Sequence, residues 1–136
     1  KLKKNIYSQP SLNGAMEISK KSARLGFEWK EINEVLTKLD EEIEEFKEAL
    51  EESSIISIEE EIGDILFTVV NLARWCNLDP EECLSRSNRK FINRFSYIEK
   101  SLQSNFSNSS RDQLKKQWNL AKETIKTQEN ISERNN

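Results

Sequence analysis

The chain has 136 residues, which is enough for one domain and too short for two ordinary ones. Hydrophobic residues make up 35% of it, so its core is thin and we expect burial against a second copy. The net charge of −3 hides a segregation, because residues 28–64 contain 15 acidic and 3 basic side chains while both flanks are positive. This acidic middle would repel a nucleic-acid polymer, so we expect none as a partner.

Targeting signals are missing from the sequence. No apolar run approaches the roughly 20 residues that span a bilayer, and the N-terminus does not resemble a signal peptide. We therefore expect a cytoplasmic protein with no membrane partner. Cys76 and Cys83 have no CxxC spacing and no His is present to complete a zinc site, so we expect reduced thiols. Because the chain opens on Lys1, we expect a trimmed chain or a domain of a longer protein.

Hydrophobic spacing predicts an all-α protein, an antiparallel bundle of about five helices. The first helix is predicted over residues 11–25 and ends at Gly26. The second is predicted over residues 31–52, with apolar residues repeating every three or four positions. Ser57 and Glu60 match a capping box, so the third helix is predicted to open at Ser57.

Two further helices are predicted downstream. Asp79 is predicted to cap the fourth helix and Ser110 the fifth, with residues 104–109 as a polar linker between them. We expect one helical domain over residues 1–128, followed by a disordered tail over residues 129–136.

Two acidic clusters carry the strongest chemical signal. Glu42 and Glu45 lie three residues apart on the second predicted helix, and Glu61 and Asp64 have the same spacing on the third. If these helices form a hairpin, the four carboxylates converge, and without a cation they repel one another and have raised pKa values. Oxygen-only ligands favour Mg²⁺, with Mn²⁺ as a substitute, over zinc or copper. The alternative is that these glutamates only form a solvated helix face.

Other residues on the same helical faces extend this candidate metal site. Lys38 precedes Glu42 by one turn, and Asn71 continues the line of Asp64 along the third helix. Gly63 costs ~1 kcal/mol in a helix interior, so we expect it to allow close packing or a ligand.

A basic ridge lies on the fourth predicted helix. Lys90 and Arg94 are one turn apart, and such side chains hold phosphate oxygens. Trp118 and Lys122 have the same spacing on the fifth helix, where an indole can stack on a base and Lys can reach a phosphate. The alternatives are an ordinary surface stripe for the ridge and core packing for Trp118.

The acidic spacing resembles a family signature. EExxE at residues 41–45 followed by ExxD at residues 61–64 is similar to the EExxE…ExxD pattern of the all-α nucleoside triphosphate pyrophosphohydrolases, most of all to MazG and its C-terminal domain. The similarity covers about residues 11–122. The other matching segments are ISKK at 18–21, GFEW at 26–29, GDILF at 63–67, VNLAR at 70–74, DPEE at 79–82 and NRKFINRF at 88–95.

The resemblance implies a Mg²⁺-dependent enzyme that splits a nucleoside triphosphate into the monophosphate and pyrophosphate, by attack of a metal-activated water at the α-phosphate. It also implies a homodimer or a tetramer. The residues carried over are metal ligands at Glu42, Glu45, Glu61 and Asp64, triphosphate contacts from Lys38, Lys90 and Arg94, and Trp118 in the nucleotide site. Their helical spacing adds Lys122 and Asn71 as candidate substrate-binding residues. Glu41 and Lys38 are the candidate catalytic residues, and the general base is either Glu41 or one of the ligand carboxylates.

Other functions remain open on the sequence. Within the same superfamily the chain could be a dCTP or dUTP pyrophosphatase, or a phosphoribosyl-ATP pyrophosphatase. A different class is a non-catalytic helical module that dimerises, with its acidic residues facing solvent.

Overall fold

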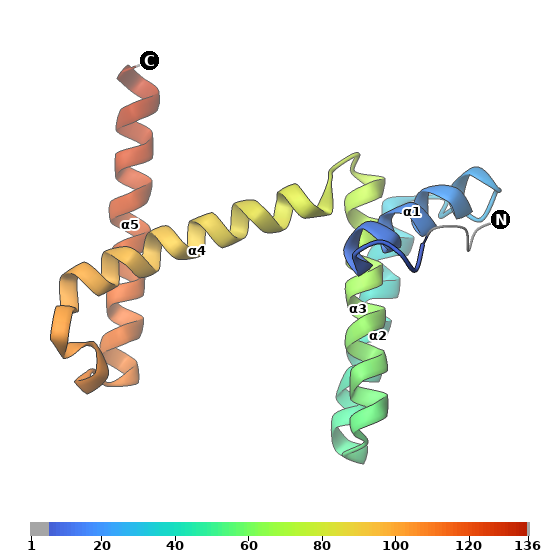
Figure 1. The fold of residues 1–136 in the computed structure, drawn as a ribbon, viewed down its shortest axis with the longest axis horizontal. Coiled ribbons are helices and arrows are strands. Elements are labelled where there is room, and N and C mark those ends of the chain that lie inside the picture. The colour runs from blue at the N-terminus through green and yellow to red at the C-terminus, as the bar shows by residue number, and fades with distance from the viewer. Residues whose placement is uncertain (1–5, 136) are drawn as a thin grey trace. The chain divides into compact units, whose positions relative to one another are not determined.

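The computed structural model describes residues 6–135, and within this range it contains five α-helices, one short 3-10 helix and no strand (Figure 1). The all-α prediction is therefore confirmed. No helix in the described part of the chain is long and apolar enough to cross a membrane. The elements are α1 (Ser11–Arg24), α2 (Ile32–Glu52), α3 (Ile55–Trp75), α4 (Pro80–Leu102), the 3-10 helix η1 (Gln103–Asn108) and α5 (Arg111–Asn135).

The chain divides into two compact units, Lys1–Cys83 and Leu84–Asn136. In the first unit α2 and α3 run side by side as an antiparallel hairpin, and α1 packs on α3 (Figure 1). The reversal is made at Ser53, whose φ of 55° lies in the left-handed region and ends α2.

The start of α3 corrects one prediction. The Ser54 hydroxyl accepts a hydrogen bond from the Ser57 amide at 3.3 Å, and α3 already begins at Ile55. The cap is therefore Ser54, and the prediction that Ser57 opens the helix was wrong. Ser57 is the third residue of α3, and its amide is one that an N-cap side chain can reach.

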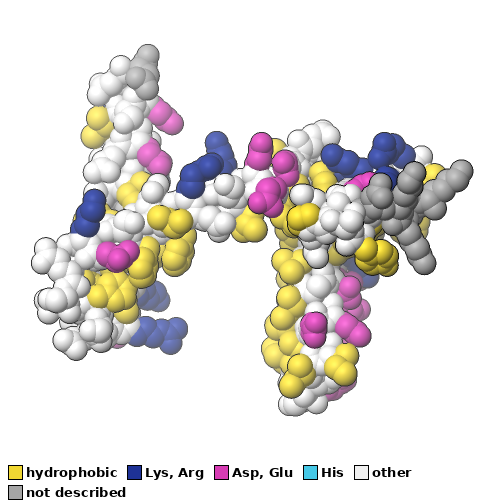
Figure 2. All heavy atoms as spheres, in the orientation of Figure 1, with side chains coloured by type: hydrophobic (Ala, Val, Ile, Leu, Met, Phe, Trp, Pro, Cys, Tyr) yellow, Lys and Arg dark blue, Asp and Glu magenta, His cyan; other side chains and the backbone are white. Residues whose placement is uncertain are grey.

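The hairpin buries only a small core. Val35 and Ala49 on α2 and Val70 on α3 are almost fully buried. Much of the apolar stripe on the two helices stays open, however, and Figure 2 shows hydrophobic side chains in a band along the hairpin. The members with exposed fractions between 37% and 59% are Ile32, Leu36, Ile43 and Leu50 on α2, and Ile62, Leu66 and Val69 on α3.

The predicted starts of the last two helices are confirmed. The Glu81 amide donates to Asp79 Oδ1 at 3.0 Å where α4 begins. At α5 the capping is reciprocal, since the Ser110 amide donates to Gln113 Oε1 at 2.8 Å and the Gln113 amide donates to Ser110 Oγ at 3.2 Å.

The second unit is held by aromatic packing. Phe91 stacks on Phe95 with ring centroids 5.9 Å apart and contacts Trp118 of α5 at 5.1 Å. The ring of Phe95 meets the ring of Phe106 of η1 edge-on, with centroids 5.3 Å apart. Ile98, on the same helix as Phe95, is buried. The predicted linker is thus largely a 3-10 helix whose Phe106 joins the aromatic cluster.

The C-terminal part of the chain continues as helix. Where a disordered tail was expected over residues 129–136, α5 extends to Asn135, and every side chain from residue 126 to residue 135 is exposed. Residue 136 lies outside the described residues.

Candidate functional site

Three carboxylates meet between α2 and α3. One oxygen each from Glu42, Glu45 and Glu61 lies within 4.8 Å of the other two. The hairpin causes this convergence, because it brings one face of α2 against one face of α3. Glu42 is buried, Glu61 is half-buried and Glu45 is exposed, so the cluster opens to solvent on one side.

Two oxygens of this cluster lack partners. Glu42 Oε2 and Glu61 Oε2 are buried and have no hydrogen-bond partner among the described residues. Leaving a buried acceptor unpaired costs about 1–3 kcal/mol, and more for a charged group. A bound divalent cation would remove this cost, and an oxygen-only donor set suits Mg²⁺ or Mn²⁺. The residues present therefore fit the metal that the sequence predicted.

Lys38 is part of the same cluster. Its Nζ lies 2.9 Å from Glu42 Oε1, one turn along α2. This contact lowers the pKa of the Glu42 carboxyl and raises the pKa of Lys38. Lys38 thus stabilises the charged form of Glu42 while leaving the second Glu42 oxygen free.

The pKa of Glu61 moves in the opposite direction. Burial of its carboxyl group, followed by the nearby charges of Glu45 and Glu42, raises the pKa of Glu61 to about 7. Raised values were expected for the whole cluster. This is confirmed for Glu61 and wrong for Glu42, because the sequence argument did not count the Lys38 ammonium among its neighbours.

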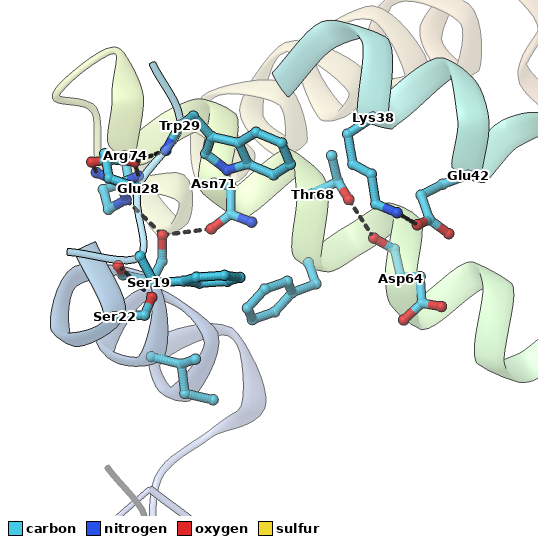
Figure 3. Close-up of a pocket in the computed structure, with 13 residues that line it drawn as sticks. Ser19, Ser22, Glu28, Trp29, Lys38, Glu42, Asp64, Thr68, Asn71 and Arg74 are labelled. Atoms are coloured by element: carbon cyan, nitrogen blue, oxygen red, sulfur yellow. Dashed lines mark hydrogen bonds and ion pairs between the residues drawn. The ribbon is translucent and has the colours of Figure 1, made fainter. Parts of the chain in front are cut away.

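Asp64 and Glu41 lie outside the three-carboxylate group. Asp64 is exposed and lines the adjoining cavity, and its backbone carbonyl accepts a hydrogen bond from Thr68 Oγ1 at 2.8 Å (Figure 3). Glu41 is exposed and is not among the residues that line this cavity. The structure thus brings together three of the four predicted metal ligands.

Gly63 does not mark a tight contact within the chain. A Cβ placed on it would meet nothing within 4 Å. The close packing expected beside Gly63 is therefore not found among the described residues, and the glycine faces open space on α3.

A cavity of about 700 Å³ extends from the acidic cluster along α3. Figure 3 shows Lys38, Glu42 and Asp64 at one end of it, and Ser19 and Asn71 at the other. Aromatic and aliphatic side chains also line the cavity. They are Ile18, Phe27, Trp29 and Phe67. The cavity therefore has the apolar lining with few placed polar groups that is typical of a small-molecule site.

Four predicted substrate-binding residues lie in the second unit. Lys90, Arg94 and Lys122 line a separate cavity of about 780 Å³ there. Arg94 lies over the Trp118 indole, with its Cζ 5.4 Å from the ring centroid. Trp118 is half-buried against Phe91, as the alternative of core packing would require.

Residues 30–98 match the model of the MazG nucleotide pyrophosphohydrolase domain. The chain belongs to this family. It is 42% identical over 90 residues to the nucleoside triphosphate pyrophosphohydrolase/pyrophosphatase MazG of Thermotoga maritima. The matched region covers 66% of this chain and 34% of that protein. It is 38% identical over 95 residues to the nucleoside triphosphate pyrophosphohydrolase of Escherichia coli K12, covering 68% of this chain and 36% of that protein. The chain thus spans about a third of the length of these MazG relatives.

The MazG match includes the acidic cluster, Lys90 and Arg94, and it excludes Ser19, Trp118 and Lys122. No function was predicted for Ser19, Glu28, Trp29 or Arg74, which line the far end of the cavity. Trp29 is half-buried there. The available signal was the helical spacing of Asn71 and Arg74, which places both side chains on one face of α3.

Proposed function

We propose that the chain is a Mg²⁺-dependent nucleoside triphosphate pyrophosphohydrolase, which converts an NTP or dNTP and water into the monophosphate and pyrophosphate. The observation that carries this proposal is a three-carboxylate cluster in which one buried oxygen each of Glu42 and Glu61 has no partner among the described residues. The family to which the chain belongs and the names of its relatives support the reaction class.

In this proposal Glu42, Glu45, Glu61 and Asp64 hold the ion. When bound, Mg²⁺ neutralises charge on phosphate oxygens and lowers the pKa of a coordinated water. A water attacks the α-phosphorus, the bond from that phosphorus to its bridging oxygen breaks, and pyrophosphate leaves. Glu41 is the candidate acceptor of the water proton, with the ligand carboxylates as the alternative.

The remaining side chains bind the substrate. Lys38 lines the cavity beside the carboxylates and offsets charge on the triphosphate as well as on Glu42. Asn71 lines the same cavity and supplies a polar contact for the nucleoside part. Lys90, Arg94, Trp118 and Lys122 of the second unit are proposed as further substrate-binding residues.

We also propose that the chain works as a homodimer or tetramer. The apolar band along α2 and α3 is open in the single chain, and Ile55 and Ile56 at the hairpin end are 81% and 72% exposed. Exposed bands of this kind are typical of protein interfaces. Sedimentation at micromolar concentration tests this assembly directly, and a monomer would contradict it.

Assays with several NTPs and dNTPs test the reaction. The expected result is pyrophosphate release that depends on Mg²⁺ or Mn²⁺ and stops in chelator. Release of orthophosphate, or no turnover with any nucleotide, would contradict the proposal. A strong preference within the panel would indicate the narrower alternatives, a dCTP, dUTP or phosphoribosyl-ATP pyrophosphatase.

The exposed apolar band also favours a second candidate, a non-catalytic helical module that dimerises. That candidate requires Mg²⁺ to leave the melting temperature unchanged and Glu42→Gln to leave function unchanged. A melting temperature that rises with Mg²⁺ in the native chain, and no longer does so in Glu42→Gln, separates the two functions.

A further inference from the structure

The cavity end far from the carboxylates is built by the segment that connects α1 to α2. This connector, residues 25–31, turns at Gly26, whose φ of 96° is a conformation that side chains rarely allow. It then places Phe27, Glu28 and Trp29 along the cavity. The connector is not helical, so its position depends on what holds it to the helices.

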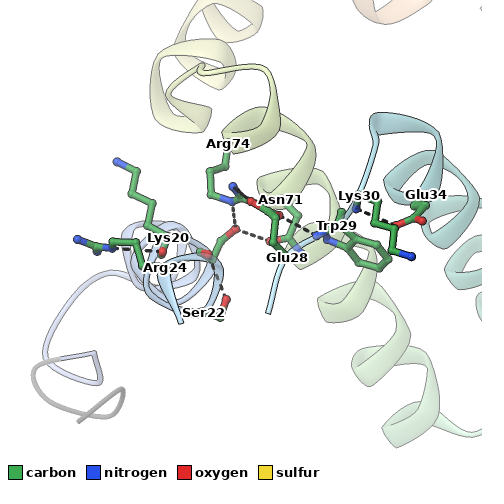
Figure 4. Close-up of polar contacts among 10 residues, drawn as sticks. Lys20, Ser22, Arg24, Glu28, Trp29, Lys30, Glu34, Asn71 and Arg74 are labelled. Atoms are coloured by element: carbon green, nitrogen blue, oxygen red, sulfur yellow. Dashed lines mark hydrogen bonds and ion pairs between the residues drawn. The ribbon is translucent and has the colours of Figure 1, made fainter. Parts of the chain in front are cut away.

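Arg74 of α3 fixes the middle of the connector at Glu28 (Figure 4). Arg74 donates from Nη1 to Glu28 Oε2 at 2.8 Å and from Nη2 to Glu28 Oε1 at 2.5 Å, which is a bidentate pair. Its Nε donates to Ser19 Oγ of α1 at 2.6 Å, and that hydroxyl donates to Asn71 Oδ1 at 2.5 Å. Arg74 thus ties α1, α3 and the connector together.

The same carboxylate also fixes the next residue. The Trp29 amide donates to Glu28 Oε1 at 2.9 Å, so Glu28 bonds Arg74 on one side and the Trp29 backbone on the other. The Arg74 contact is the largest cause of the lowered pKa of Glu28, which keeps this carboxyl ionised at neutral pH. The Trp29 side chain is therefore positioned through a short chain of charge-assisted bonds.

We propose that Arg74 is a positioning residue for nucleotide binding, which acts through Glu28 to hold the Trp29 indole as the wall on which the nucleobase stacks. This inference rests on the proposed function, because it assigns the base to the cavity end opposite the phosphates. Asn71 and Asp64 are seven residues apart on α3, a rise of roughly 10 Å, which leaves room for a nucleoside between the two ends. Indole faces stack on any base, so this wall recognises the base ring without fixing its identity.

The test compares nucleotides with a substrate that has no base. KM and kcat are measured for ATP, CTP and ribose 5′-triphosphate with the native chain, Arg74→Lys and Glu28→Gln. Arg74→Lys keeps the charge but loses the bidentate geometry, and Glu28→Gln weakens the charge-assisted bonds. We expect each variant to raise KM for both nucleotides by about tenfold with kcat within about twofold, and to leave KM for ribose triphosphate unchanged.

A matched control is available on α2. Glu44 forms an exposed ion pair with Lys47 at 2.8 Å and does not line the cavity, so Glu44→Gln should leave all constants unchanged. Trp29→Leu should raise KM for nucleotides as Glu28→Gln does, and the double variant should not add the two effects. If Arg74→Lys does not fold, Glu28→Gln and Trp29→Leu still test the inference, because both change the connector and leave α3 intact.

Two results would overturn the inference. Equal rises of KM for nucleotides and ribose triphosphate would show a general effect on the site, and unchanged KM values in every variant would show that the Arg74 contacts only stabilise the fold. If the native chain lacks turnover, calorimetry with a non-hydrolysable ATP analogue replaces kinetics. In that case Glu28→Gln should weaken analogue binding about tenfold while Mg²⁺ binding alone stays unchanged, so failure of the proposed reaction is distinguished from failure of this inference.

Discussion

The two ends of the cavity differ in how their polar groups are satisfied. At the acidic end, Glu42 and Glu61 each keep a buried oxygen without a partner among the described residues. At the other end, the guanidinium of Arg74 is engaged by Glu28 and Ser19. Unsatisfied buried groups indicate a missing ligand, whereas a satisfied network indicates a framework. The comparison assigns ion binding to the first end and positioning to the second.

The largest expected effect comes from removing a carboxylate at the acidic end. Glu61→Gln and Glu42→Gln should each lower the rate of pyrophosphate release by at least about 100-fold, because a ligand to the ion is lost. Glu44 lies on α2 like Glu42 but outside the carboxylate cluster, so Glu44→Gln should keep the native rate. A Glu61→Gln variant with native activity would contradict the assignment of ion binding to the acidic end of the cavity.

A pH titration of the metal-free chain tests the environment of the Glu61 carboxyl group. The pKa of Glu61 is raised to about 7 from 4.5, so the folded chain holds this proton more tightly than the unfolded chain. Its contribution to stability is complete below pH 4.5 and is lost as the pH rises through 7. The melting temperature should therefore fall between pH 5 and pH 8.

Two controls accompany this titration. Glu28 and Glu42 have lowered pKa values, so their contributions are lost only as the pH falls below about 4.5, outside the tested window. Glu61→Gln should flatten the fall, and saturating Mg²⁺ should reduce it. A native profile that rises steadily from pH 5 to pH 8 would contradict the assigned environment of Glu61.

A smaller effect is expected at the turn that sets the hairpin. Ser54→Ala should lower the free energy of unfolding by about 1 kcal/mol, because it removes the N-cap of α3. Urea unfolding measures this change, with Ser57→Ala as the matched control at the position where the sequence alone predicted the cap. A greater loss from Ser57→Ala would contradict the observed start of α3.

The smallest effect concerns the helix surface beside the acidic end. A Cβ at Gly63 meets open space in the single chain, so Gly63→Ala should stabilise it by about 0.5–1 kcal/mol. Urea unfolding at low protein concentration measures this gain. A loss of stability at low concentration would contradict the open space around Gly63. A loss that appears only at high protein concentration would show that another copy packs on Gly63.

Local signals predicted much of the fold. The caps at Asp79 and Ser110 depend on residues within three positions of each other, and both were found as predicted. The cap of α3 was misplaced because Ser57 and Glu60 match the capping-box pattern, whereas Ser54 caps the helix with Ser57, not Glu or Gln, three residues later. Periodicity identified the apolar faces of α2 and α3, but it carries no information on whether another element covers them.

In the candidate site, too, local spacing predicted some contacts and missed others. The spacing of Glu42, Glu45 and Glu61 predicted their convergence because a hairpin follows from two adjacent amphipathic helices. The pair between Arg74 and Glu28 joins residues 46 positions apart, and no local pattern marks it. Such contacts depend on how the connector lies against α3, which only the folded chain determines.

The most direct test of the central claim is the position of a bound ion. Crystals grown with Mn²⁺ and a non-hydrolysable nucleoside triphosphate give anomalous scattering that locates the metal without assumptions about the protein. We expect a peak coordinated by the carboxylates of Glu42, Glu45 and Glu61, with Asp64 as the fourth ligand. A Mn²⁺ peak elsewhere in a nucleotide-bound crystal, with these carboxylates free of metal, would contradict it.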